Sequence, residues 1–363
     1  MTETIFTHLR SLQTELIGGS LPFVSWRLPG ISAPETIGSS KLPEQITDIR
    51  NLNKLGSGFI VAPFLSTDPA LFIPRQWCRR GFHFDPLPLK FESRKHPLTS
   101  REIEFIGKKE YMQGVESAIQ RIKQGELAKV VLSRIVAELL PDGFDVSLLF
   151  EQLCSNYPRA FVYLIHLPGK GIWAGASPEL LAKIEGEEIT TMALAGTRKA
   201  GITGNWAIKE QEEQHWVSQY IAELFTESGA TRVQQSEAYT SNAGPVEHLR
   251  TDFSAHLPVG YSGQLIENLH PTPAVCGWPK ERALEVITAL ETHDREFYTG
   301  FVGPVNGNGG NGKLYVNLRC LQIADHHAYI YVGGGITVDS DPEAEWEETI
   351  LKSKTLLDVI KKC

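Results

Sequence analysis

The hydrophobic pattern near the end of the chain predicts a helix that begins at about residue 342. Asp341 suits the N-cap position, and Pro342 suits the first helical turn, where its missing N–H leaves no hydrogen bond unmade. The apolar residues Leu356 and Val359 continue a stripe of charged positions at helical spacing. The charged members of this stripe are Glu345, Glu348 and Lys352. The pattern therefore turns two carboxylates and a lysine toward the interior.

A second predicted helix, over residues 206–225, repeats this arrangement. Its apolar stripe consists of Val217, Ile221 and Leu224. The stripe runs back onto Glu213 and Glu210, which are again three positions apart. Carboxylates that face the interior are costly unless they are paired or bind a metal.

Two inward pairs of carboxylates suit a hard cation such as Mg²⁺. This ion usually takes one or two protein carboxylates and shares the rest of its coordination with substrate and water. Taken alone, either pair is more simply explained as a solvated acidic face. Because both pairs continue apolar stripes, the sequence favours a Mg²⁺ site between the two helices.

The rest of the chain predicts many strands and scattered helices. Residues 1–100 alternate short apolar runs with Gly, Pro and Ser, which is typical of strands joined by turns. Further helices are expected over 109–125, 146–154 and 279–292. Strands are expected over 129–136, 160–166, 172–176, 180–184, 188–193 and 328–332, with a glycine-rich bend after the last and a less regular section over 226–269. Without steady βαβ alternation, this order predicts an α+β fold with extensive mixed or antiparallel sheet.

Composition narrows the classes of function. The chain has 363 residues and a net charge of −8, which argues against nucleic acid as the main partner. An anionic small molecule remains possible if its cleft is locally positive. No apolar run has the length of a signal-peptide core or a membrane span. The 5 cysteines are an odd number without close pairs, so we expect a cytoplasmic protein with neither a disulfide framework nor a zinc site.

Single residues add further candidates. Lys129 opens an apolar strand; it is either an ordinary solvated lysine or, in a closed cleft, a usable general base. Glu179 lies at a strand–turn–strand junction; it is either solvated or, in an apolar pocket, an acid of raised pKa. His270 in a proline-rich loop and Arg319 at the end of a strand could each bind a ligand or be structural. Residues 307–313 match a phosphate-binding loop formally, but Leu314 replaces the required Ser or Thr, which favours a hairpin turn.

In their order along the chain, these segments resemble the chorismate-utilising enzymes, which include isochorismate synthases, salicylate synthases and the synthase subunits of anthranilate and aminodeoxychorismate synthases. The resemblance implies one structural domain, a large β-sandwich with helices packed outside. Residues 1–100 would form its N-terminal part, which matches loosely, and residues 101–363 its chorismate-binding catalytic region. The segments that carry the resemblance are 129–134, 175–179, 194–198, 209–213, 270–275, 295–298, 318–319 and 332–352.

The resemblance also implies roles for single residues. Glu213 and Glu348 would bind Mg²⁺ directly, and Glu210 and Glu345 would hold waters bound to it. The contacts to chorismate would come from Gly196, Thr197 and Lys352 at the ring carboxylate, from Tyr298, Arg319 and Gly335 at the enolpyruvyl carboxylate, and from His270 beside the ring. One departure is Gln214, where relatives usually carry histidine.

Lys129 is similar to the members that use water, since those that use ammonia usually carry glutamine there. The resemblance therefore implies an isochorismate synthase, in which Lys129 activates water for addition at C2 and Glu179 protonates the departing C4 hydroxyl. No glutaminase subunit is expected, and the protein would be a monomer or a weak homo-oligomer in menaquinone or siderophore synthesis. The alternatives are a salicylate synthase, which Ala274 and Val275 disfavour, an ammonia-using synthase subunit, or a non-catalytic ligand-binding homologue.

Overall fold

The computed structural model describes residues 2–81, 83–84, 105–243, 246–258, 260–306 and 311–363. Within them, ten strands form a first antiparallel sheet and ten a second. The first sheet follows the order β16 (Gly277–Trp278), β8 (Lys129–Leu139), β20 (His327–Ile336), β19 (Cys320–Ala324), β10 (Gly171–Ser177), β9 (Phe161–Leu167), β1 (Phe23–Arg27), β2 (Glu35–Gly38), β6 (Trp77–Arg80) and β7 (His83–Phe84). The second follows β13 (Thr231–Gln235), β15 (Val246–His256), β12 (Glu188–Lys199), β11 (Leu180–Glu185), β18 (Asn311–Val316), β17 (Phe301–Asn306), β4 (Gly58–Ala62), β5 (Ala70–Pro74) and β3 (Glu44–Ile46), and β14 (Tyr239–Ala243) pairs with β15.

An aromatic core fills the space between the two sheets. Trp173 of the first sheet is fully buried, with its ring stacked on Tyr331 and its edge against Phe297. Phe161 of the first sheet stacks on Tyr315 of the second with 4.1 Å between ring centroids. Large apolar side chains alternate along these strands, so burying them joins the sheets into one sandwich.

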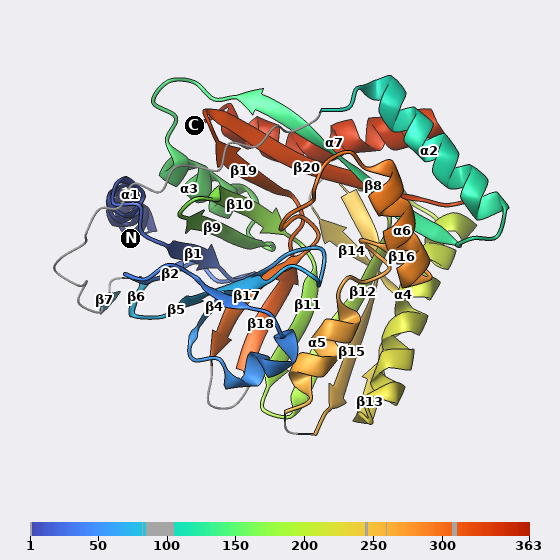
Figure 1. The fold of residues 1–363 in the computed structure, drawn as a ribbon, viewed down its shortest axis with the longest axis horizontal. Helices are drawn as coiled ribbons and strands as arrows, with labels where there is room; N and C mark the ends of the chain where they lie inside the picture. Colours follow the sequence, from blue (N-terminus) through green and yellow to red (C-terminus); the bar gives the residue numbers. More distant parts are fainter. Residues whose placement is uncertain (1, 82, 85–104, 244–245, 259, 307–310) are drawn as a thin grey trace.

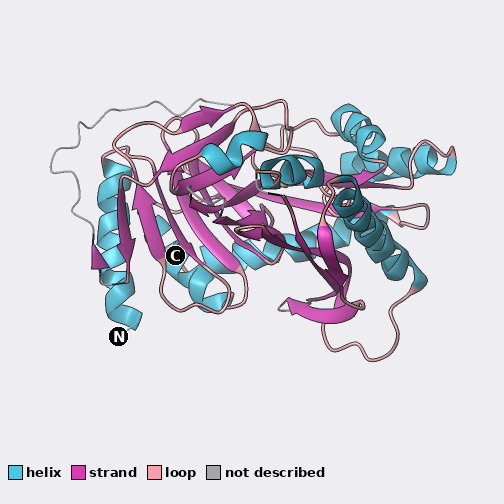
Figure 2. Cartoon of the chain, turned by 90° about the horizontal axis from the view of Figure 1, so that it is seen from below, coloured by secondary structure: helices cyan, strands magenta, loops and turns pink. Residues whose placement is uncertain are grey.

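Helices cover the outer faces (Figures 1 and 2). On the first sheet lie α1 (Thr2–Gly18), α3 (Val146–Asn156) and α7 (Pro342–Ile360). On the second lie α4 (Ile208–Glu227), α5 (Ser262–Leu269) and the short 3₁₀ helix η1 (Ile49–Lys54). The pair α2 (Lys108–Lys123) and α6 (Lys280–Leu290) packs around the start of β8. None of the described helices is long and apolar enough to cross a membrane.

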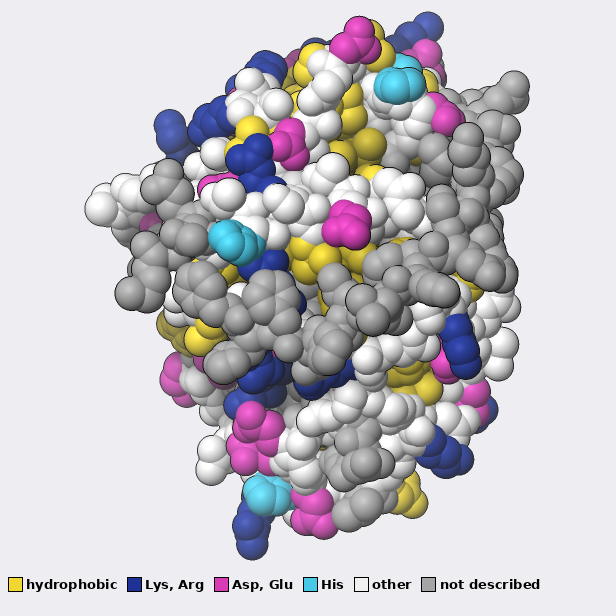
Figure 3. All heavy atoms as spheres, turned by 90° about the vertical axis from the view of Figure 1, so that its left-hand side faces the viewer, with side chains coloured by type: hydrophobic (Ala, Val, Ile, Leu, Met, Phe, Trp, Pro, Cys, Tyr) yellow, Lys and Arg dark blue, Asp and Glu magenta, His cyan; other side chains and the backbone are white. Residues whose placement is uncertain are grey.

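These layers confirm the predicted α+β sandwich. Asp341 caps α7 by accepting from the Ala344 N–H, with Pro342 at the first helical position, as the sequence predicts. Strands on both sides of residue 100 belong to the same two sheets. On the face in Figure 3, Lys and Arg side chains are interspersed with Asp and Glu over its described part.

Three local predictions are wrong. Residues 2–18 form a helix, because Phe6, Leu9 and Leu16 lie on one buried face. Strand β20 continues through the glycines at 333–335 where a bend was expected, since its ladder to β8 extends to Ile336. The less regular section at 226–269 contains β13, β14, β15 and α5. Residues 307–310 lie outside the described part, but Asn306 and Asn311 on either side are paired across an antiparallel ladder, as a hairpin requires.

Candidate active site

A cavity of about 120 Å³ lies where α4 and α7 approach the end of β20; we call it the inner cavity. It brings together residues that are far apart in the sequence and come from both sheets. The predicted site residues that line it are Glu179, Gly196, Glu210, Glu213, Tyr298, Arg319, Gly335, Glu348 and Lys352.

The glycines of β20 allow the acidic helices to come close. A Cβ added at Gly335 would lie 2.9 Å from Glu213 Oε1, and one added at Gly334 would lie 2.8 Å from Glu345 Oε2. Any side chain at these two positions would therefore push back the carboxylates of α4 and α7. The glycine run shapes the site without ending the strand.

Lys129 lies behind the lining of the inner cavity and contacts it through Glu213. Its side chain is fully buried, and Nζ donates to Glu213 Oε1 at 2.6 Å. The N–H of Gly196 donates to Glu213 Oε2 at 3.2 Å. Burial opposes ionisation of Glu213, but the Lys129 ammonium outweighs burial and lowers the pKa of this carboxyl. Glu213 is therefore an anion held from two sides.

On α7, Lys352 forms an ion pair with Glu348, as Lys129 does with Glu213. Its Nζ lies 2.5 Å from Glu348 Oε1 and donates to the carbonyl of Gly333 at 2.8 Å. Burial would raise the pKa of Glu348, yet the ion pair with Lys352 lowers it. Each of the two expected direct metal ligands thus carries a negative charge at the cavity wall.

The other two acidic residues keep oxygen atoms unused. Glu345 Oε1 accepts from Ser340 Oγ at 2.7 Å and from Lys209 Nζ at 3.2 Å. Glu345 Oε2 and Glu210 Oε2 are buried without a hydrogen-bond partner among the described residues. Burial and the nearby Glu348 raise the pKa of Glu345. Two buried carboxylate oxygens without donors are typical of a place where a cation or its bound water belongs.

This donor set fits Mg²⁺ bound largely through water and substrate. All four carboxylates supply oxygen, the ligand that Mg²⁺ prefers, and Mg²⁺ usually needs only one or two of them directly. Among the described residues, no three His, Cys, Asp or Glu side chains converge closely enough to hold a metal by themselves. The residues therefore fit an open, hydrated Mg²⁺ site and not a closed protein cage.

Glu179 lies at the junction of β10 and β11 and lines the same cavity as the carboxylates of α4 and α7. Only 3% of the residue is exposed. Burial raises the pKa of Glu179 to about 8, although the charge of Lys129 works against the rise. Glu179 is thus largely protonated at neutral pH and can give up a proton within the cavity.

The remaining wall carries candidate contacts for an anion. Arg319 has a left-handed backbone (φ 47°), and burial lowers the pKa of its guanidinium. Tyr298 stacks on Tyr331 at 5.5 Å, and burial raises its pKa, so it stays a neutral hydroxyl. Gly196 (φ 68°) lies at a bulge of β12, where a Cβ would meet Glu210 Cβ at 2.9 Å. The side chain of Thr197 lies outside the described part of the structure.

His270 lies outside the inner cavity, contrary to the expectation that it sits beside a bound ring. Its Nε2 is 2.9 Å from the carbonyl oxygen of Pro63, and it lines a separate cavity of about 40 Å³. Burial between β4 and α5 holds the ring there as a structural hydrogen-bond donor. The histidine at the inner cavity is His248 on β15, whose Nδ1 lies 3.1 Å from the carbonyl oxygen of Gly196.

Sequence reasoning missed His248 and Lys209. Burial, together with Arg319, lowers the pKa of His248 to about 4, so the imidazole is neutral. His248 faces the site because β15 pairs with β12, with its Cα opposite that of Thr197. That register could not be read from the sequence. Lys209 was detectable, since it lies one position before Glu210 on a helix already assigned to the site.

Comparison with known proteins identifies the family. The family model described as chorismate binding enzyme matches residues 85–361. The isochorismate synthase EntC of Escherichia coli K12 is 29% identical over 310 residues, 82% of this chain and 79% of EntC. The crystal structure of DhbC from Bacillus anthracis has a TM-score of 0.80 at 24% identity, covering 99% of this chain and 100% of that one. The menaquinone-specific isochorismate synthase MenF of Escherichia coli has a TM-score of 0.78 at 22% identity, covering 93% and 88%. Because the family model matches about three quarters of its length, the chain belongs to the chorismate binding enzymes.

Proposed function

We propose that this protein is an isochorismate synthase, which interconverts chorismate and isochorismate with Mg²⁺. The observation that carries the proposal is a fully buried lysine, Lys129, behind the wall of a small cavity that is lined by the buried Glu179, whose pKa is raised to about 8. Lys129 and Glu179 are close enough for the charge of one to act on the pKa of the other. Addition of water on one side of a ring and loss of hydroxide on the other needs such a base and acid.

In the proposed reaction, Lys129 takes a proton from the water that adds at C2. Glu179 gives its proton to the C4 hydroxyl, which leaves as water while the ring double bonds shift. In the structure, Lys129 Nζ donates to Glu213, so the amine acts as a base only after its extra proton has gone to bulk solvent. One water enters and one leaves in each turnover, which ends with Lys129 protonated and Glu179 ionised. Proton exchange with solvent restores both residues, and in the reverse direction they exchange roles.

The two carboxylates of the substrate would meet the positive groups of the wall. Lys352 on α7 and the Gly196 bulge line the inner cavity, where they would hold the ring carboxylate, and Arg319 with Tyr298 would hold the enolpyruvyl carboxylate. Mg²⁺, when bound by Glu213 and Glu348 with Glu210 and Glu345 around it, would orient the ring carboxylate and draw electron density from the ring.

Ala274 and Val275 favour isochorismate over salicylate as the product. Both residues line the inner cavity and neither offers a polar side-chain group. Salicylate formation needs the enolpyruvyl group to fold over the ring and leave as pyruvate, and a polar group at this wall would be needed to hold that pose. The buried Lys129, in turn, favours water over ammonia as the nucleophile, since ammonia needs no base.

The test is to incubate the purified protein with chorismate and Mg²⁺ and to identify the products by NMR, beside the variant Lys129→Gln. We expect isochorismate from the wild type without stoichiometric pyruvate, and a rate at least about 100-fold lower for Lys129→Gln because the base is lost. Release of one pyruvate per chorismate with a fluorescent aromatic product would overturn the proposal. So would isochorismate formation by Lys129→Gln at the wild-type rate.

A further inference from the structure

A second and larger cavity adjoins the inner one on the side of α3. This outer cavity measures about 770 Å³, against about 120 Å³ for the inner cavity. Their lining is partly common, which places the two cavities next to each other. The residues that line both are Pro178, Leu194, His248, Arg319 and Lys352.

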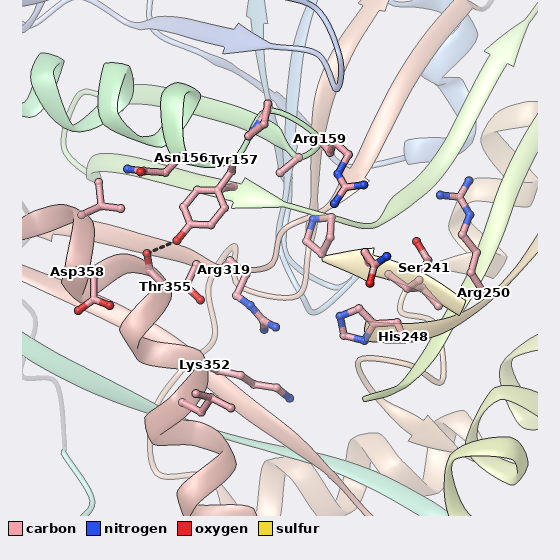
Figure 4. A pocket seen from close by; sticks show the side chains of 18 of the residues that line it. Asn156, Tyr157, Arg159, Ser241, His248, Arg250, Arg319, Lys352, Thr355 and Asp358 are labelled. Atoms are coloured by element: carbon pink, nitrogen blue, oxygen red, sulfur yellow. Dashed lines mark hydrogen bonds between the residues drawn. The ribbon is translucent and has the colours of Figure 1, made fainter. Parts of the chain in front are cut away.

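The lining of the outer cavity is strongly basic. Its only acidic residue in the described part of the chain is Asp358. Its basic residues are Arg159, Arg250, Arg319, Lys352 and Lys362. This is a local reversal of charge in a protein whose net charge is −8. Figure 4 shows Arg159, Arg319 and Lys352 extending toward the same open space beside His248.

The basic groups stand on a fixed frame. Tyr157, at the end of α3, donates its hydroxyl to the carbonyl oxygen of Thr355 on α7 at 2.8 Å, which ties together the two elements that carry Arg159 and Lys352 (Figure 4). Arg250 already binds Asp252 at 2.6 Å, so part of its charge is neutralised. Arg159 is exposed and forms no ion pair with any described residue, so its charge is available to an incoming anion.

The sizes of the cavities suggest an order of binding. Pockets for drug-sized ligands measure about 300–1,000 Å³, a range that includes the outer cavity and exceeds the inner one. A small dianion therefore fits the outer cavity as it stands. It enters the inner cavity only where side chains such as Lys352, now held by Glu348, give way to it.

We propose that the outer cavity is an entry chamber, in which a small dicarboxylate of the chorismate type is captured by Arg159 at the rim before it moves past His248 into the inner cavity. This inference rests on the proposed function, because the charge of the ligand is that of chorismate. Basic groups at the rim of a cleft raise the rate of association with an anion, and this effect falls as salt screens the charges.

The test measures the rate constant for productive capture by isotope trapping, in which enzyme mixed with labelled chorismate is chased with an excess of unlabelled chorismate. The variants are Arg159→Ala, Arg159→Glu and the control Arg232→Glu. Arg232 is exposed on β13 and lines neither cavity, so its substitution makes the same change of net charge elsewhere. Each protein is measured at about 20 mM and at about 500 mM NaCl. The Debye length exceeds 10 Å at the lower concentration and falls well below 10 Å at the higher one.

At low salt we expect capture to slow about threefold in Arg159→Ala and about tenfold in Arg159→Glu, with less than a twofold change in Arg232→Glu. At high salt all four proteins should agree within about twofold, whereas a merely structural defect would persist at both concentrations. Equal capture rates for Arg159→Glu and Arg232→Glu at low salt overturn the entry chamber while leaving the proposed function intact. A wild type that does not convert chorismate at all overturns the proposed function and, with it, the ligand assigned here.

Discussion

At the scale of single residues, burial decides the protonation state of Glu179. Its pKa of about 8 means that the carboxyl is a proton donor at neutral pH and becomes an anion above that value. The neighbouring lysine and glutamate at 129 and 213 show the opposite case, in which an ion pair offsets burial and keeps the carboxyl charged. The same cavity thus holds one carboxyl as an acid and another as an anion, because only one of them has a bonded cation.

This difference predicts the effect of Glu179→Gln on stability. A pKa raised from 4.5 to about 8 means that the wild type loses stability as pH rises from 4.5 to 8, because the unfolded chain ionises this carboxyl over that range while the folded protein keeps it protonated. Glutamine imitates the protonated form and has no such loss. In urea denaturation followed by circular dichroism, the two proteins should match near pH 4.5, and the variant should be more stable by on the order of 2 kcal/mol at pH 8.

Although Glu179→Gln should be the more stable protein at pH 8, its activity should fall by about 100-fold or more because the proton donor is lost. The forward rate of the wild type should decline above pH 8 as Glu179 ionises. A variant that is neither stabilised at pH 8 nor slowed would show that Glu179 is an ordinary solvated carboxylate.

At the scale of elements, the helical stripes were readable from the sequence and the strand pairings were not. The spacing of Glu210 and Glu213 with Val217 identifies the inward face of α4 directly, because a helix repeats locally. The placement of His248 depends on the register of β15 against β12, which joins residues about fifty positions apart. The continuation of β20 through its glycines depends on its long-range ladder to β8. Long-range register was thus the information that could not be read from the sequence.

Gln214 on α4 is hydrogen-bonded to β12, and we expect these bonds to position the Gly196 N–H against Glu213. Its Oε1 accepts from the Ala195 N–H at 2.9 Å, and its Nε2 donates to Thr251 Oγ1 at 3.0 Å. These bonds fix the bulge whose next N–H, that of Gly196, binds Glu213. Gln214→Leu should lower the free energy of unfolding by about 2 kcal/mol, since it leaves buried partners unpaired. It should also raise the Mg²⁺ concentration for half-maximal activity about tenfold.

The control for Gln214→Leu is Gln219→Leu, because Gln219 is exposed on the same helix and, among the described residues, its side chain hydrogen-bonds only to Glu223. It should leave both quantities within experimental error. An unchanged Mg²⁺ requirement in a destabilised Gln214→Leu protein would reduce Gln214 to a purely structural residue.

The proposed Mg²⁺ site can be tested through Glu348 on helix α7. Replacing Glu348 by Gln removes one of the proposed anionic oxygen ligands from the cavity wall while keeping the size of the side chain. We expect Glu348→Gln to lose Mg²⁺-dependent turnover and to bind Mg²⁺ at least about tenfold more weakly in isothermal titration calorimetry. Glu347→Gln, at the exposed neighbouring position, should behave as wild type. Wild-type turnover in Glu348→Gln, or in the presence of excess chelator, would contradict the Mg²⁺ assignment.

At the scale of the whole molecule, the sandwich brings the site together from both sheets. Glu179 follows a strand of the first sheet, Gly196 lies on a strand of the second, and α4 and α7 come from the outer layers on opposite sides. The first hundred residues contribute strands β1 to β7, which belong to the same two sheets. The overall charge of −8 gives no hint of the basic lining of the outer cavity beside the site, because charge is arranged locally and not averaged over the surface.

The most direct test of the central claim, that Lys129 and Glu179 exchange a solvent water for the C4 hydroxyl, is the reaction in H₂¹⁸O. The product is isolated early, and the label is located by mass spectrometry and by the isotope shift of its ¹³C signals. The account predicts isochorismate with one ¹⁸O at C2 and none retained from the C4 hydroxyl of the substrate. It also predicts that isochorismate returns to chorismate labelled at C4. A product whose C2 hydroxyl carries the original, unlabelled oxygen would contradict the account, because the hydroxyl would then have moved within the molecule without water.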